Sequence, residues 1–366
     1  MNSQPSPLLL LGVGGSGATL VRGIVRSFGP GIRPLVLDTD ARSGGNGDIP
    51  FMLLGGNRLA GRGTGGQPAA ARAAFQDNPA FLDTSLEGVR TAVVVTALGG
   101  GTGGGATGEI LKHLHTLGIV TLLFATMPFS FEGDDRRRAA RTAAGPIEQH
   151  ADVSVFLPLD ELVANAGTDN MREAFDRGLD TLASGVTLLW RLLEKPGYIH
   201  LDAERLRNIL SASGKGYFAT ATAHGPDRVD TILADLARHP LLMRSESSPP
   251  VRSVLVGVLG GDDLRLSEIG MIVGGLTAAF GSGAAIELGT VNDEETFSGR
   301  LAVAVLVFEE SATTRPVQDK GGQRKLSDEH VALSANSWFR NAEKTIWNGE
   351  DLDIPTYLRR SLTLDR

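Results

Sequence analysis

Seven glycines between residues 97 and 108, in the segment ALGGGTGGGATG, limit the fold of this chain more than any other feature. The apolar run TAVVVT (91–96) comes directly before them, and a segment typical of a helix follows. Glycine at a strand-to-helix junction permits positive φ and lets backbone N–H groups approach a ligand closely. The helix N-terminus adds about half a positive charge. The segment therefore predicts a phosphate-binding corner.

A second glycine loop, GVGGSG at residues 12–17, follows the apolar run at residues 8–13. Neither loop carries the Gly-Lys-Ser/Thr of a P-loop, so a Walker site is excluded. A glycine turn with a purely structural role stays the alternative for either loop alone. Because consecutive strands of a parallel sheet end at the same edge, the sequence predicts that both loops face one crevice.

Short apolar runs at 8–13, 33–40, 91–98, 118–128 and 151–158 alternate with helix-like segments, which is typical of strands buried on both faces of a parallel sheet. Apolar residues at helical spacing over 171–197 then predict one long helix that stops at Pro196-Gly197. Beyond it, helices are predicted at 202–213 and 227–239, and strands at 251–261, 284–291 and 300–308, as far as Glu310. The predicted fold is α/β, a doubly wound parallel-sheet nucleotide-binding domain joined by a long central helix to a smaller α+β domain.

Composition excludes several classes of function. The 366 residues contain no cysteine, which rules out disulfides, thiolate metal sites and cysteine nucleophiles. A formal charge of −7 argues against nucleic-acid binding. No apolar run approaches 18 residues, so direct membrane insertion is not expected and a cytoplasmic protein is predicted. The histidines are scattered, and no protein metal site is predicted.

The segment GGGTGGG (99–105) resembles the signature of the FtsZ/tubulin family of polymerising GTPases. Further segments resemble that family in the same order, namely GVGGSG (12–17), LDTDA (37–41), GRGTGGQP (61–68), MPFSFEGDDR (127–136), GDDLRLSE (261–268) and DLDIPTYLRR (351–360). The resemblance implies GTP or GDP as ligand with Mg²⁺, head-to-tail self-assembly into filaments, and a cytoskeletal role in bacterial cell division and septation at midcell. The chain would be the division protein itself or a divergent paralogue.

With this resemblance the predicted parts are a GTP-binding domain (1–170), a connecting helix (171–197), a C-terminal α+β domain (198–310), a flexible linker (311–350) and a partner-binding peptide (351–366). The peptide, including Asp351–Arg360, resembles the segment that docks on membrane-tethering division proteins. Ile354, Tyr357 and Leu358 fall at spacings of three and four, which predicts one apolar helical stripe. A frayed tail is the alternative.

The resemblance also implies the residues that hold the nucleotide. The phosphates would be bound by Gly14, Gly15, Ser16, Gly17, Gly63, Gly65, Gly100, Gly101, Thr102 and Gly103. Thr102 would add a hydroxyl donor, compatible with a helix N-cap. Asp38 or Asp40 would line the crevice and orient a hydrated cation, with capping of the next turn as the alternative for Asp40. Glu132 and Arg136, four residues apart, would contact ribose and phosphates or form a surface salt bridge.

The base site departs from the family pattern. Phe175 matches the aromatic residue that stacks on the base, with core packing as the alternative, and Asp180 matches the carboxylate that pairs with guanine. The family expects an asparagine near Leu159 and another at Thr19. The resemblance therefore implies guanine binding at a weakened site.

The catalytic loop departs further. The family places Asn-x-Asp-x-x-Asp in the nucleotide pocket of the neighbouring subunit, whereas this chain has HLDAER at 200–205. Asp202 is kept, with an N-cap of the following helix as its alternative role, and His200 and Arg205 replace the asparagine and the second aspartate. Pairing of Asp202 with Arg205 would lower the basicity of the remaining carboxylate, so slow hydrolysis is expected. Glu204 is the alternative second carboxylate, although it points about 100° round the helix.

Two other functions stay open at this point. A paralogue that binds nucleotide and shapes filaments without appreciable turnover fits the altered catalytic loop. A Rossmann oxidoreductase fits the glycine loops, but no acidic residue stands where that fold places one, and it leaves the terminal peptide unexplained.

Overall fold

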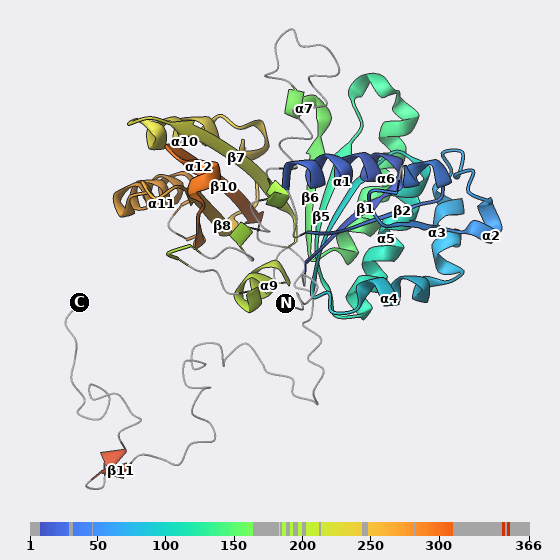
Figure 1. Ribbon diagram of the computed structural model, residues 1–366, viewed down its shortest axis with the longest axis horizontal. Helices are drawn as coiled ribbons and strands as arrows, with labels where there is room; N and C mark the ends of the chain where they lie inside the picture. The colour runs from blue at the N-terminus through green and yellow to red at the C-terminus, as the bar shows by residue number, and fades with distance from the viewer. Residues whose placement is uncertain are drawn as a thin grey trace. The chain divides into compact units, whose positions relative to one another are not determined.

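The computed structural model describes residues 8–28, 32–45, 47–163, 183, 185–187, 191–192, 197–199, 203–211, 214–243, 248–281, 283–309, 346–347 and 350–351. The chain forms two compact units, Met1–Ala312 and Thr313–Arg366. Nearly all described residues belong to the first unit, whose elements Figure 1 labels in chain order.

The first sheet has six parallel strands among the described residues, in the order β3-β2-β1-β4-β5-β6. Their bounds are β1 Leu8–Val13, β2 Arg33–Asp38, β3 Phe51–Leu53, β4 Thr91–Ala97, β5 Val120–Met127 and β6 Val153–Pro158. Five of them match the predicted apolar runs, and β3 was missed because three residues give no pattern. The order reverses between β1 and β4, so the two glycine loops flank the topological switch point, where open α/β sheets bind ligands.

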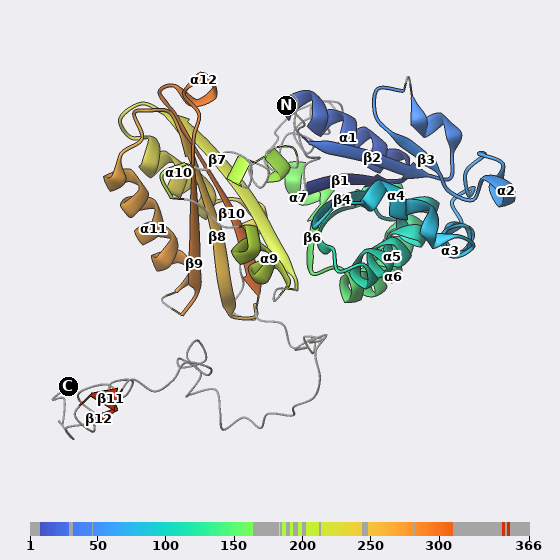
Figure 2. The same cartoon turned by 60° about the horizontal axis from the view of Figure 1, so that its bottom comes forward.

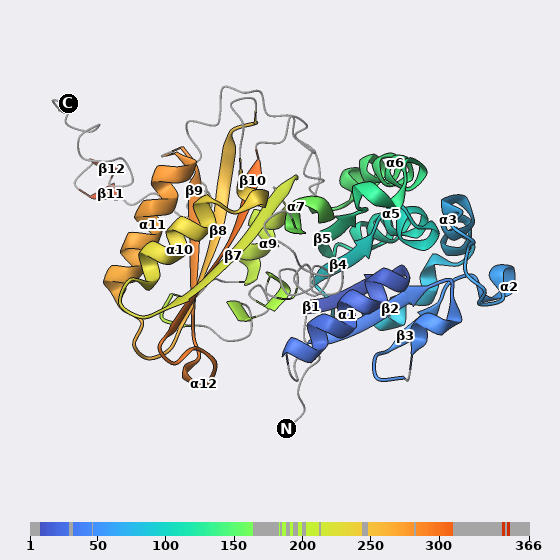
Figure 3. The same cartoon turned by 90° about the horizontal axis from the view of Figure 1, so that it is seen from above.

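Helices cover both faces of this sheet. They are α1 Gly14–Phe28, α2 Gly56–Leu59, α3 Pro68–Gln76, α4 Asp83–Leu86, α5 Gly101–Thr116, α6 Asp134–His150 and α7 Leu159–Val163. Leu8 and Leu10 of β1 pack on the side of α1, whereas Leu9 and Leu11 pack on the side of α3, α5 and α6. Figure 3 shows α1 on the opposite side of the strands from α5 and α6. Burial on both faces explains the uninterrupted apolar runs.

Glycines bring α5 unusually close to its neighbours. A Cβ at Gly103 would collide with the carbonyl oxygen of Ala97 in β4, and one at Gly105 would collide with the carbonyl of Pro68 in α3. Part of the glycine run therefore serves helix packing, a use that the sequence analysis did not foresee.

The second sheet is mixed, in the order β7-β10-β8-β9. Its strands are β7 Gly216–His224, β8 Val251–Gly260, β9 Ala285–Asn292 and β10 Arg300–Glu309, with β10 antiparallel to β7 and β8, and β8 parallel to β9. The helices of this part are α9 Ala203–Ser211, α10 Arg228–Ala237, α11 Leu266–Phe280 and α12 Glu294–Phe297. Figure 2 shows α10 and α11 along one face of the sheet, where they build an apolar core.

A buried arginine joins the start of α10 to the start of α11 through two carboxylates, of which Glu268 is 14% exposed and Asp263 is 48% exposed. Arg228 donates from Nε and Nη2 to Glu268 at 2.7 and 2.8 Å, and from Nη1 to Asp263 at 2.6 Å. Only 6% of the Arg228 side chain is exposed. These carboxylates raise the pKa of Arg228, Glu268 first, and Arg228 lowers the pKa of Glu268. These contacts tie the first turn of α10 to the first turn of α11, on the face of the sheet that both helices cover.

Two predicted segments fall largely outside the described residues. Of the predicted helix at 171–197, residues 183, 185–187 and 191–192 are described as helical. In the second unit, β11 Ile346–Trp347 pairs with β12 Glu350–Asp351 in antiparallel fashion, at the border between the predicted linker and peptide. The rest of the predicted peptide lies outside the described residues.

Candidate nucleotide-binding site

A cavity of about 350 Å³ opens at the carboxyl edge of the first sheet. Four loops supply its walls, and the lining residues are Val13, Gly14, Gly15, Ser16, Asp38, Thr39, Asp40, Arg42, Ser43, Arg62, Gly63, Thr64, Gly65, Gly66, Ala97, Gly100, Gly101, Thr102, Gly103 and Arg136. This volume lies within the range of small-molecule sites. The prediction that both glycine loops face one crevice is confirmed.

Two helix N-termini point backbone N–H groups at this cavity. Helix α1 begins at Gly14, whose φ of +79° is open to glycine at no steric cost, and α5 begins at Gly101 after its N-cap Gly100. No acidic side chain lies in the first turn of either helix, and no side chain caps α5. The free N–H groups and the helix dipoles thus favour an anionic ligand such as a phosphate.

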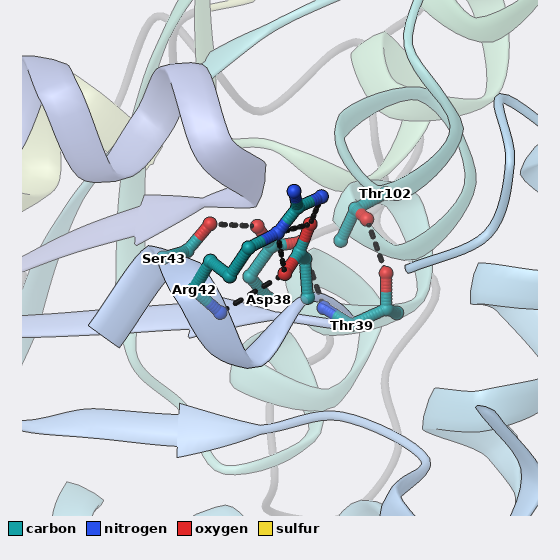
Figure 4. Close-up of polar contacts among 6 residues, drawn as sticks. Asp38, Thr39, Arg42, Ser43 and Thr102 are labelled. Carbon is teal, nitrogen blue, oxygen red and sulfur yellow. Dashed lines mark hydrogen bonds and ion pairs between the residues drawn. The ribbon is translucent and has the colours of Figure 1, made fainter. Parts of the chain in front are cut away.

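Hydroxyl groups and a buried carboxylate fix the floor of the cavity (Figure 4). The hydroxyls of Thr39 and Thr102 lie 2.7 Å apart and join the loop after β2 to the start of α5. Asp38, only 3% exposed, accepts from the backbone N–H of Thr39 at 2.7 Å and from the hydroxyl of Ser43 at 2.5 Å. Arg22 donates in turn to the carbonyl of Ser43. The floor is therefore held in place by its own hydrogen bonds.

Asp40 forms an ion pair with Arg42 at the rim. Nε of Arg42 lies 3.1 and 3.2 Å from Oδ1 and Oδ2, and Nη2 lies 2.7 Å from Oδ2. Oδ1 also accepts from the backbone N–H of Arg42 at 2.9 Å and so caps the 3₁₀ turn Ala41–Gly44. These hydrogen bonds from Arg42 lower the pKa of Asp40. The capping alternative is confirmed.

Backbone hydrogen bonds tie the loop at 61–66 to the loop that follows β2. The N–H of Gly63 donates to Thr39 at 3.0 Å, and that of Ala41 donates to Gly61 at 2.9 Å. Gly63 and Gly65 both line the cavity, with φ of +78° and +59°. These left-handed conformations explain why glycine stands at both positions.

One predicted phosphate contact, Gly17, and the predicted capping role of Thr102 need correction. Gly17 does not line the cavity, because it packs on Gly12 and on the carbonyl of Val95. Thr102 is not the N-cap of α5, since Gly100 takes that position. Gly101 and Gly103 line the cavity, yet a Cβ at Gly101 would meet the hydroxyl of Thr64, so both also serve packing.

Arg136 lines the cavity and pairs with Glu132, with Nη1 3.0 Å from Oε2. The two residues do not share a helix, although their spacing predicts one. Glu132 ends the 3₁₀ turn Ser130–Glu132 and accepts from the backbone N–H of Phe129 at 2.9 Å, whereas α6 begins after Gly133. The salt bridge is present, and only its arginine reaches the cavity wall.

Most of the predicted base site lies outside the described residues, including Phe175 and Asp180. Leu159 begins α7 at the end of β6. The hydroxyl of Thr19 donates to the carbonyl of Gly15 at 3.2 Å, within α1.

In the predicted catalytic loop, His200 and Asp202 lie outside the described residues. Arg205 donates from Nε and Nη2 to the two carboxylate oxygens of Glu287 in β9, each at 2.7 Å. Glu204 pairs with Arg207 and lies 3.5 Å from Arg90. A partner 82 residues away along the chain thus engages Arg205.

The sequence analysis missed several polar residues of the cavity, namely Thr39, Arg42, Ser43, Arg62 and Thr64. Arg42 could have been predicted to line the cavity, because it stands two residues after Asp40 in a loop that follows a predicted strand of the same sheet.

A doubly wound sheet whose glycine loops converge at the switch point defines a nucleotide-binding α/β protein. Residues 8–167 match the model of the tubulin/FtsZ family GTPase domain. The chain is similar to the cell division protein FtsZ of Azotobacter vinelandii, 30% identical over 80% of this chain and 74% of that protein. It is also similar to that of Pseudomonas putida, 28% identical over 98% of this chain and 90% of that protein. The chain therefore belongs to the tubulin/FtsZ family.

Solved structures share the fold. An empty FtsZ dimer of M. jannaschii matches with a TM-score of 0.77 at 21% identity, over 89% of this chain and 96% of that one. CetZ2 from Haloferax volcanii, a GTPγS-bound protofilament, matches with a TM-score of 0.70 at 21% identity, over 84% and 94%. The predicted fold class is confirmed.

Proposed function

We propose that this chain is a GTP-binding, self-assembling cytoskeletal protein of bacterial cell division that hydrolyses GTP slowly at a site shared between adjacent subunits. The observation that carries the proposal is the convergence of two glycine-lined helix N-termini on one cavity at the switch point. Membership of the family and its relatives named as cell division proteins support the cellular role.

The lining of the cavity supports a shared site. Glu204 and Arg205, which the resemblance assigns to catalysis, are absent from the residues that line it within their own chain. Nucleotide bound here would meet such residues only when a second copy supplies them. CetZ2 from Haloferax volcanii, solved as a GTPγS-bound protofilament, provides a precedent for self-association in a protein of the same fold.

GTP turnover measured against protein concentration tests the proposal. We expect the rate per chain to rise with concentration and to level off once the chain is assembled, because an isolated subunit lacks the residues of its neighbour. Sedimentation under the same conditions should report assembly over the same range. A rate per chain that is independent of concentration would contradict a shared site.

Arg205 supports slow hydrolysis and favours a second candidate function, a structural or regulatory filament component without appreciable turnover. Its positive charge stands where the family places a carboxylate.

Because Arg205 pairs with Glu287, a simple Arg205→Asp variant would set the introduced carboxylate against a like charge. The double variant Arg205→Asp/Glu287→Gln avoids this repulsion. We expect it to raise turnover on the order of a hundredfold, as a well-placed base does. Glu287→Gln alone is the control, and an unchanged double variant would assign slow hydrolysis to another cause.

The terminal peptide at 351–366 is proposed to bind a membrane-tethering division protein and recruit the chain from the cytoplasm to midcell. Within the described residues no helix is long and apolar enough to cross a membrane. Deleting 351–366 should abolish recruitment while nucleotide binding and assembly persist. Loss of polymerisation with tether binding intact would assign the segment to the folded body instead.

A further inference from the structure

We propose that Arg42 supplies the positive charge that balances the phosphates of a bound nucleotide, so that binding does not depend on a divalent cation held by this chain. The inference rests on the proposed nucleotide-binding function. It concerns the loop that follows β2, and it arises from the groups that line the cavity.

Arg42 is placed for this role by its own 3₁₀ turn. Its side chain, labelled in Figure 4, lines the cavity and is 88% exposed. Asp40 holds the guanidinium group through Nε and Nη2. A guanidinium group has five N–H donors in a planar fork that fits phosphate oxygens two at a time. The contacts with Asp40 leave the remaining donors for a ligand.

The carboxylates of the cavity do not fit a bound Mg²⁺. Mg²⁺ is usually held through one or two carboxylates together with phosphates and water. Asp38 and Asp40 are the acidic residues that line the cavity in the described part of the chain, and both are engaged. Each oxygen of Asp40 bonds the Arg42 guanidinium, and those of Asp38 accept from Thr39 and Ser43. Nowhere in that part do three His, Cys, Asp or Glu side chains gather as metal ligands.

Arg42 can bind phosphate without leaving Asp40. The Arg42 side chain is 88% exposed, so the donors that Asp40 does not use are open to a ligand. A terminal phosphate carries more negative charge than a carboxylate and accepts a bidentate arginine. Arg42 therefore receives the phosphates with its remaining donors, while Asp40 stays engaged and holds the guanidinium group in place.

The test measures GTP affinity of the full chain by calorimetry, once with Mg²⁺ and once with EDTA. The parent should bind GTP within about threefold of the same Kd in both conditions. In Arg42→Gln the affinity in EDTA should fall about tenfold or more, the range expected for a lost hydrogen bond to a charged group. Mg²⁺ should restore much of it, since Asp40 is then free.

Arg58→Gln is the matched control. Arg58 forms the same kind of exposed pair, with Asp77 at 2.8 and 2.9 Å, but does not line the cavity. It should behave as the parent. A parent that binds GTP only with Mg²⁺, or an Arg42→Gln variant that keeps its affinity in EDTA, overturns the inference and leaves the proposed function standing. A parent that binds no GTP in either condition overturns both.

Discussion

Arginine forms ion pairs with carboxylates in two regions of this protein, and the two kinds of pair have opposite consequences. At the cavity rim, Arg42 is 88% exposed and bonds Asp40 alone among the contacts described for its side chain. Between α10 and α11, Arg228 is 6% exposed and bonds both Glu268 and Asp263. Water can reach the guanidinium group of Arg42 and replace Asp40, whereas the buried guanidinium group of Arg228 depends on its carboxylate partners.

Burial, rather than the number of charged residues, separates a pair that stabilises the fold from one that remains available for a ligand. Removing one partner of a buried pair leaves an uncompensated charge, while many surface pairs contribute nothing measurable. The same distinction applies to the glycines of α5 and its N-cap, where Gly103 is packed and Gly100 is open.

The largest expected effect comes from Arg228→Met, which removes the cation and leaves the carboxylate of Glu268, only 14% exposed, without its charged partner. We expect the free energy of unfolding to fall by about 3 kcal/mol, as for other broken buried pairs. Urea unfolding followed by circular dichroism measures it. Arg42→Met is the matched control and should unfold as the parent does. Equal losses in both variants would refute the distinction by burial.

Gly103→Ala should destabilise by about 1–3 kcal/mol, because its Cβ collides with the backbone carbonyl of Ala97. Gly100→Ala should leave stability nearly unchanged, since no atom lies within 4 Å of its Cβ and its φ of −95° suits alanine. Its methyl group alters the cavity wall, so weaker GTP binding is expected. Thermal unfolding and calorimetry separate the two effects. Normal GTP binding by Gly100→Ala would exclude a close phosphate contact there.

The smallest expected effect is on the pH dependence of stability. Arg228 lowers the pKa of Glu268 in the folded state, so the unfolded state takes up its proton first as pH falls. The stabilisation from Glu268 is therefore present above about pH 4.5, the ordinary pKa of a glutamate, and is lost as pH falls through the folded pKa. Glu268→Gln should flatten the acid limb of stability against pH. Asp40→Asn, at the exposed pair, should leave that limb almost as steep as in the parent.

Much of the fold could be predicted because long apolar runs and glycine junctions are local signals. Four leucines in a row before GVGGSG predict a buried strand wherever the chain places it. Helix α11 had no such signal, since its run LSEIGMIVGGLTAAF combines glycines with apolar residues on most sides. Strand β7, rich in alanine and threonine, was missed for the same lack of contrast.

The site could be predicted in its backbone and less in its side chains. Glycine spacing located both loops. It does not distinguish a glycine with open space beside it, such as Gly100, from a glycine that makes room for a neighbouring backbone carbonyl, such as Gly103. Arg205 and Glu287 stand 82 residues apart, so their pairing is fixed by the approach of α9 to β9 and has no local trace.

The close packing of α5 gives the cavity one stiff wall and one compliant wall. Helix α5 cannot shift toward β4 or α3 without forcing Gly103 and Gly105 against the carbonyls of Ala97 and Pro68, and packed interiors resist compression. Elsewhere in the cavity wall, Gly65 and Gly66 turn through positive φ with open space where a side chain would stand. A difference in shape between one bound nucleotide and another should therefore be absorbed at the Gly65-Gly66 turn, with α5 as the fixed reference.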